Sequence, residues 1–203
     1  MYETLKKRLF QAVEDEDIAG IDAALKDGAN INAHDGFGET LLIRAVHKHP
    51  KILHHLLKNN ADVHVVDNFF NAPISIAVFY NRQEAACLLL AHGSDADHVN
   101  NYGETPLIYT AKYDYPEMAK LLLKHGADPE RAPRRDNKPL DIARSKKHEN
   151  VITLIEEALQ QKLQKEETDN RLAFEKAQTR KKEKAAHSNQ GNLRSYLHRP
   201  RRR

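Results

Sequence analysis

Cysteine and tryptophan are almost missing from this 203-residue sequence, which has one Cys, Cys87, and no Trp. A single Cys excludes an intrachain disulfide framework and indicates a reducing compartment, so we expect a cytoplasmic protein. Cys87 stands in the apolar string 85–90, where we expect it to be a small packed residue. The hydrophobic fraction of 40% is low for a globular core but normal for a narrow array of repeats.

Long apolar runs are also lacking. The longest ones are far shorter than the roughly 20 residues that a membrane-spanning helix requires. The N-terminal residues 1–6 do not form a secretory signal pattern. We therefore expect a soluble protein with no membrane span and no N-terminal targeting segment.

Motifs that carry chemistry are missing as well. There is no P-loop, no H-E-x-x-H and no nucleophile elbow, and Gly36-Phe37-Gly38 lacks the third Gly of a dinucleotide fingerprint. Twelve His residues occur without the spacing of metal ligands. His54 and His55, for example, are adjacent and would point about 100° apart on a helix. We expect no catalytic residues, no metal site, no cofactor and no enzymatic activity.

What the sequence does contain is repetition. The string Thr105-Pro106-Leu107 recurs, with substitutions, as Thr40-Leu41-Leu42, Ala72-Pro73-Ile74 and Lys138-Pro139-Leu140, at steps of 32, 33 and 33 residues. A second landmark, Gly126, recurs as Gly93, Asn60 and Gly28, at steps of 33, 33 and 32 residues. Thr and Pro are typical of a helix start, and Gly or Asn of a left-handed helix end. Two independent landmarks therefore keep one period.

The period, the T-P-L string and the L-L-x-x-G-A-D string resemble the ankyrin repeat family, whose unit is a β-turn followed by two helices. The resemblance implies an all-α ankyrin repeat solenoid over residues 1–159. Its repeats would span about 2–34, 35–66, 67–99, 100–132 and 133–159. Repeat two is one residue short near His49-Pro50, so we expect a tighter turn between its helices. The family's usual His after T-P-L is replaced by Ile43, Ser75, Ile108 and Asp141.

The remaining residues predict a long C-terminal helix. Residues 160–187 are rich in strong helix formers and form a charged helical extension. We expect Ser188–Asn192 to break this helix and residues 188–203 to be a disordered basic tail. Residues 160–203 carry a net charge of +8 within a chain of net charge +3, which leaves −5 for residues 1–159.

This charge asymmetry suggests an electrostatic partner for the C-terminal segment. The expected contact residues are Arg180, Lys181, Lys182, Arg199, Arg201, Arg202 and Arg203. The partner would be an acidic protein, nucleic acid, an anionic membrane surface or a nuclear-import receptor. The alternative is that the segment is simply a solvated helix with a soluble end.

The resemblance also implies where a protein partner would bind. In an ankyrin stack, the turn tips and the exposed ends of the first helices line one concave face. The candidate partner-binding residues at those positions are Phe37, Glu39, His47, Lys48, Phe69, Asn71, Phe79, Tyr80, Tyr102, Glu104, Lys112, Tyr113 and Arg135. Six of the chain's 13 aromatic residues are among them, and large rings dominate binding energy at interfaces. The alternative is that these rings pack on neighbouring repeats or fill space left by the absent His.

We therefore expect a non-enzymatic adaptor that binds another protein on the concave face through aromatic anchors. One alternative is a nuclear regulator associated with nucleic acid or chromatin through the basic tail. Another is an effector of an intracellular bacterium that acts in the host cell, since small ankyrin proteins with abundant Lys, Asn, Gln and His are common in such organisms. The sequence leaves the partner and the oligomeric state open.

Overall fold

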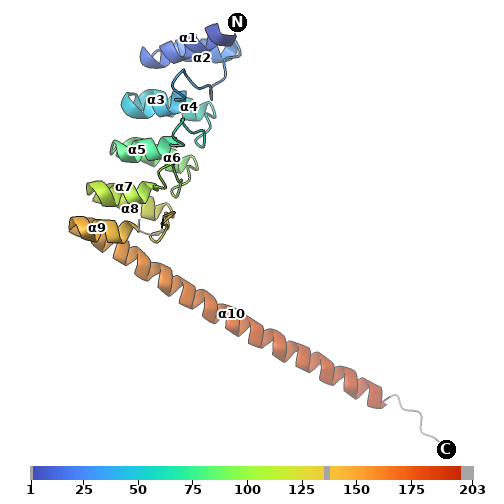
Figure 1. Cartoon of the computed structure of the whole chain (residues 1–203). Coiled ribbons are helices and arrows are strands. Elements are labelled where there is room, and N and C mark those ends of the chain that lie inside the picture. The colour runs from blue at the N-terminus through green and yellow to red at the C-terminus, as the bar shows by residue number, and fades with distance from the viewer. Residues whose placement is uncertain (1, 135–137, 198–203) are drawn as a thin grey trace, which may run out of the picture. The chain divides into compact units, whose positions relative to one another are not determined.

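The chain forms paired helices that follow one another along the sequence (Figure 1). The structure, a computed structural model, describes residues 2–134 and 138–197; the side chains of Tyr2, Lys48 and residues 182–197 lie outside this description. Compactness divides the chain into two units, residues 1–158 and 159–203. The helices are α1 (Tyr2–Glu14), α2 (Ile18–Lys26), α3 (Leu41–Lys48), α4 (Pro50–Lys58), α5 (Pro73–Phe79), α6 (Gln83–Ala91), α7 (Pro106–Tyr113), α8 (Pro116–Lys124), α9 (Pro139–Lys146) and α10 (Glu149–Leu197).

The helices of the first unit stack in two rows. The first helix of each pair contacts the first helix of the next, from α1 through α3, α5 and α7 to α9. The second helices α4, α6 and α8 contact one another in the same way. Over the described ranges the fold is all-α, and the one β-type pairing is an isolated bridge between His34 and Thr40. The predicted helix-pair architecture is therefore confirmed.

The repeated Thr and Pro residues start the helices as their types predict. Thr40 and Thr105 are the N-caps of α3 and α7, and each Oγ1 accepts a hydrogen bond from the backbone N–H three residues ahead, at 3.2 and 3.3 Å. Pro73, Pro106 and Pro139 occupy first-turn positions, where a missing N–H leaves no hydrogen bond unmade. The cap and the proline fix where each first helix begins.

Apolar residues fill the space between successive pairs. Leu41, Leu53, Ile74, Leu89 and Met118 are completely buried. Burying one such side chain contributes about 1.5–3 kcal/mol, which a single pair would lose because it leaves one face open to water. The core is therefore continuous along the array instead of being confined to one repeat.

The turn between the two helices of a repeat contains one residue in the left-handed conformation. That residue is Glu16, Asn81, Asp114 or Lys147 in repeats one, three, four and five, with φ between 51° and 60°. Repeat two has no such residue, because His49 alone, at φ −129°, both ends α3 and precedes α4. The tighter turn expected in repeat two is confirmed, and the residue it lacks is the left-handed one.

Three expectations are wrong. α10 continues through Ser188–Asn192 to Leu197, so these residues do not break the helix. A single Gly lowers helix stability by only about 1 kcal/mol, and α10 contains no Pro between Glu149 and Leu197. The expected disorder of residues 188–197 is likewise replaced by helix, and residues 198–203 lie outside the described range.

Cys87 is exposed on α6 and is not packed. In the described part of the chain, no helix is long and apolar enough to span a membrane.

Neighbouring turns are also linked by partly buried polar side chains. Both carboxylate oxygens of Asp97 accept a hydrogen bond from the Asp128 N–H, at 3.0 and 3.1 Å. Burial raises the pKa of Asp97 above its ordinary value of 3.8, and the carboxylates of Asp128 and Asp95 raise it further. Two repeats earlier the neutral amide of Asn32 accepts the equivalent bond from Asp62 N–H, at 2.9 Å.

We expect Asp97→Asn to raise the free energy of unfolding at neutral pH. Because the pKa of Asp97 is raised in the folded state, folding favours the protonated form of this carboxyl group. The stability that the protonated form contributes is lost as the pH rises from 3.8 through the raised pKa. The gain should shrink as pH falls toward 3.8, where the wild-type carboxyl becomes neutral. Urea unfolding of both chains across this pH range measures the difference. A variant less stable than wild type at neutral pH would contradict the expectation.

Candidate protein-binding surface

The turn tips of repeats two, three and four are each built by one Asp or Asn side chain. The Oδ1 atoms of Asp35, Asp67 and Asn100 each accept hydrogen bonds from the backbone N–H groups two and four residues ahead. The acceptor–donor distances are 2.8 and 2.9 Å for Asp35, 2.8 and 2.8 Å for Asp67, and 3.0 and 3.1 Å for Asn100. This is the local bonding that Asp and Asn favour in turns. The residue two positions ahead, which is Phe37, Phe69 or Tyr102, is thereby fixed at the tip.

The three tip aromatics are exposed. Phe37 is 83% exposed, and about half of Phe69 and Tyr102 is accessible. The Phe69 and Tyr102 rings stack at a centroid distance of 6.5 Å and an angle of 18°. The Asn101 N–H donates to the Phe69 carbonyl at 3.1 Å, which ties the tips of repeats three and four together. The tips of these repeats therefore present neighbouring rings at a fixed spacing.

A second group of rings comes from the first helices and the turns that follow them. We call it the aromatic stripe, and it consists of His47, Phe79, Tyr80, Tyr109, Tyr113 and Tyr115. Its contacts begin with His47 edge-on to Tyr80 at 4.6 Å and Tyr80 edge-on to Phe79 at 4.9 Å. Phe79 then contacts Tyr109 and Tyr113 at 5.6 and 6.2 Å, and Tyr113 stacks near Tyr115 at 6.0 Å. The stripe crosses repeats two, three and four without interruption.

The stripe remains open to solvent. Phe79, Tyr80 and Tyr113 are 40%, 47% and 50% exposed. The rings pack on neighbouring repeats, as the alternative to partner binding expected. They also leave much of their surface exposed, as partner binding requires. Exposed large apolar side chains that form one connected group are typical of interaction surfaces.

Tyr109 anchors the stripe to the turn tips. Its ring is buried, and its hydroxyl accepts a hydrogen bond from Asn100 Nδ2 at 3.1 Å. Burial raises the pKa of Tyr109, and the neighbouring Glu104 carboxylate raises it further. Tyr109 therefore stays a neutral phenol, and the Asn100 side chain that shapes the turn also positions the stripe.

Three of the charged candidate residues, Glu39, Glu104 and Lys112, are paired within the protein. Lys112 Nζ is ion-paired with Glu104, whose side chain is mostly buried. Glu39 Oε2 lies 3.5 Å from an Arg44 guanidinium nitrogen. These charged side chains already form ion pairs within the protein. They therefore make the surface more rigid and leave little unpaired charge for a binding partner.

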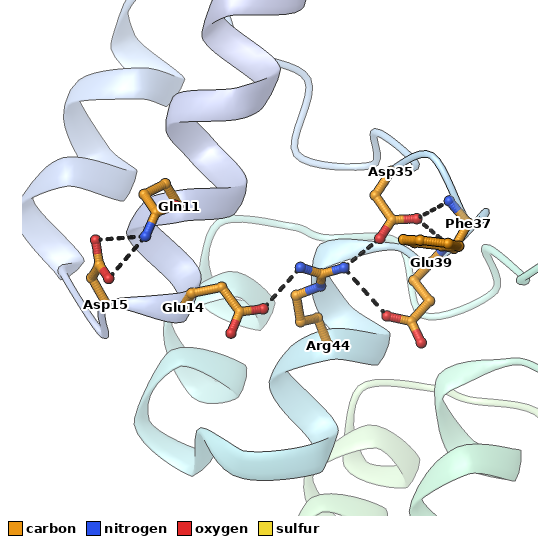
Figure 2. A network of polar contacts seen from close by, with 7 residues as sticks. All are labelled: Gln11, Glu14, Asp15, Asp35, Phe37, Glu39 and Arg44. Atoms are coloured by element: carbon orange, nitrogen blue, oxygen red, sulfur yellow. Dashed lines mark hydrogen bonds and ion pairs between the residues drawn. The ribbon is translucent and has the colours of Figure 1, made fainter.

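Figure 2 shows the Arg44 cluster, in which one guanidinium lies between the carboxylates of repeats one and two. Arg44 Nη1 donates to Glu14 Oε1 at 2.8 Å, and Nη2 donates to Asp35, the residue that shapes the Phe37 turn. The guanidinium also lies 5.2 Å from the centre of the Phe10 ring. Arg44 thus links the first repeat to the first aromatic tip.

Several predicted site residues have a structural role or lie outside the description. Asn71 donates to Asp67 Oδ2 at 2.9 Å and accepts from Asn100 at 3.1 Å, so it joins neighbouring turns. Arg135, Arg199 and Arg201–Arg203 lie outside the described residues, as do the side chains of Lys48 and Lys182. Arg180 and Lys181 are exposed on α10. Among the described residues, no three metal-binding side chains form a group.

Sequence reasoning missed three aromatic residues at this surface, namely Phe70, Tyr109 and Tyr115. Tyr109 is buried and Tyr115 lies in the turn between α7 and α8, so neither occupies a position that the repeat pattern marks as exposed. Phe70 had a signal. It occupies the turn position that Gly38 and Gly103 fill in repeats two and four, with φ 59° against 83° and 71° for the glycines. It is also more than half exposed.

The family model for ankyrin repeats (3 copies) matches residues 9–100 and 74–166, which together cover most of the chain. The chain therefore belongs to the ankyrin repeat family, as its repeated strings indicated. Repeats of this family are in general non-enzymatic modules for protein–protein interaction. No curated protein matches the chain.

We expect Phe70→Gly to raise the free energy of unfolding by about 1 kcal/mol, because a left-handed conformation is costly for any residue with a Cβ. Gly103→Ala at the equivalent turn should lower it by at least a similar amount, since Gly103 is left-handed and an added Cβ would also meet the Arg134 side chain at 2.8 Å. Urea unfolding measures both. Equal effects of the same sign would contradict the assignment of strain to the turn position.

Proposed function

We propose that this protein is an adaptor that binds a protein partner on its concave face, with the aromatic stripe and the tips Phe37, Phe69 and Tyr102 as anchors. The observation that carries the proposal is the connected, half-exposed stripe across repeats two to four. A solvated surface gains nothing from such rings, whereas an interface gains most of its binding energy from them.

The packing of the rings favours tight binding. Each ring of the stripe contacts at least one other, so little rotamer freedom is left for a partner to freeze out. Immobilising a flexible side chain costs about 0.5–1.5 kcal/mol on association, and a preformed surface avoids most of that cost. The internally paired Glu104 and Lys112 support the same rigid arrangement.

We also propose that the protein works in the cytoplasm. The lone Cys87 thiol is exposed and has no disulfide partner, a state that a reducing compartment maintains.

Replacing Phe69, Phe79, Tyr80 and Tyr113 together by Ala should abolish partner capture. Hot-spot rings each contribute about 2 kcal/mol or more, so the affinity should fall on the order of a hundredfold or more. Circular dichroism should stay unchanged, because the completely buried aliphatic core is not touched. The measurement is affinity purification with the intact chain as bait, followed by quantitation of each captured protein.

The matched control is Leu172→Ala with Phe174→Ala, two exposed apolar residues of α10. This control should retain the partner. Undiminished recovery of the same partner by the four-residue variant would overturn the proposal.

A second candidate function rests on charge. Residues 160–203 carry a net charge of +8, and Arg180 and Lys181 are exposed on α10. We propose as the alternative function that this segment binds nucleic acid while the repeats recruit a second factor.

Cutting the chain at residue 160 should then weaken nucleic-acid binding. It should also flatten the dependence of log K on log salt concentration by about one unit for each lost phosphate contact. Fluorescence anisotropy with a labelled duplex at several salt concentrations measures both. Unchanged affinity and slope would remove this candidate.

A further inference from the structure

A pocket lies between repeats two and three, at the end of the repeats where the two helices of each pair are joined. Its volume is about 460 Å³, within the range of sites that bind small molecules. Its lining includes Ala45, Pro50, Leu53, Arg82, Glu84 and Ala85. They come from α3, α4, the turn before α6 and the start of α6.

The pocket adjoins the shortened turn of repeat two. There α3 and α4 are joined by His49 alone, whereas α5 and α6 are joined by the three residues 80–82. The missing left-handed residue leaves the longer turn of repeat three without a matching turn beside it. The shortened turn therefore accounts for the hollow.

The next repeat shows how the position is otherwise filled. Arg82 precedes α6, and 33 residues later Tyr115 precedes α8. Tyr115 is half-buried and packs against the core, whereas Arg82 is exposed. Repeat three thus places a cation at the pocket where repeat four places a packed ring.

We propose that this pocket takes one leucine-sized side chain of the partner, together with a carboxylate beside it that pairs with Arg82. The inference rests on the proposed function, because it assigns a further contact to the same partner. Pro50 is an exposed apolar residue of the lining, and covering it together with the methylene groups of Arg82 and Gln83 removes apolar surface from water.

The charge of the rim favours an acidic group. Arg82 makes no ion pair with any described residue, and a guanidinium binds a carboxylate through two parallel hydrogen bonds. Glu84 lines the same pocket with the opposite charge. It lies in the first turn of α6, where the helix dipole offsets part of its negative charge. Glu84 should therefore weaken the preference for a carboxylate without reversing it.

The pocket continues the proposed binding surface. His47 lines it, and the His47 ring also contacts Tyr80 of the aromatic stripe at 4.6 Å. A segment that runs along the stripe past Tyr80 reaches the pocket with its next side chains. Because the pocket lies at one end of the stripe, it would then fix the direction in which the partner segment runs along the stripe.

Three small probes test the site on the full chain: 4-methylpentanoate, 4-methylpentan-1-ol and 4-methylpentylamine share a leucine-like body and differ in charge. Amide chemical shifts of Ala45, Leu53 and Ala85 are followed by two-dimensional NMR at millimolar probe concentration, the range expected for ligands of so few atoms. The carboxylate should bind best and the amine worst, each step being about threefold or more. No shift at these amides, or a preference for the amine, would overturn the proposal.

Two side-chain variants separate the charges. Arg82→Gln should reduce carboxylate binding to the level of the alcohol and leave alcohol binding unchanged. Glu84→Gln, the matched control on the same rim, should strengthen carboxylate binding. An Arg82→Gln variant with an unchanged order of the three probes would show that Arg82 does not select the ligand.

An insertion tests the origin of the pocket. One Asn added between Lys48 and His49 restores the 33-residue period and the left-handed turn residue, so it should close the pocket and abolish binding of the alcohol while the array stays folded. Equal binding before and after the insertion would overturn the assignment. Because the probes need no protein partner, their result is independent of partner capture. Bound probes with capture unaffected by the aromatic substitutions would leave the pocket standing and remove the proposed function.

Discussion

Every structural feature of this array depends on one constraint, namely that a helix pair of about twenty residues cannot cover both of its own apolar faces. Leu53, Leu89 and Met118 are completely buried because a neighbouring pair covers them. Successive pairs must therefore present matching surfaces, which is why the period stays at 32 or 33 residues. The turns and caps serve this requirement, since they fix where each helix begins and at what spacing the next one follows.

The same requirement creates the surface that we propose for binding. Once Asp35, Asp67 and Asn100 shape equivalent turns, the residues at equivalent positions must line up from repeat to repeat. An aromatic residue placed once gives an isolated ring, and the same choice made in successive repeats gives a continuous stripe. The hydrogen bond from Asn100 to the Tyr109 hydroxyl connects the turn to the stripe. The Asn100 side chain therefore both shapes the turn and positions the proposed binding surface.

Much of this arrangement can be predicted from the sequence, because the signals are local. The Thr caps, first-turn Pro residues and periodic Gly or Asn residues determine the helix pairs, and the short repeat two correctly predicts its tighter turn. Contacts between repeats are harder to predict, since nothing in the helical pattern shows that the hydroxyl of the buried Tyr109 bonds to Asn100. The sequence also did not show that the candidate contact residues Glu104 and Lys112 form an ion pair with each other. The long helix was underestimated at Ser188–Asn192, where several weak helix formers lower stability without preventing the helix.

The Arg44 cluster implies that stability varies along the array with ionic strength. The junction of repeats one and two includes a partly exposed guanidinium among the carboxylates of Glu14, Asp35 and Glu39. Dissolved ions screen such contacts, whereas they leave the burial of Leu89 or Met118 in the middle repeats largely unaffected. In a chain whose repeats contact only their neighbours, the first pair can then peel away while the others remain folded. Salt would thus set how much of the Phe37 end of the surface is in place at any moment.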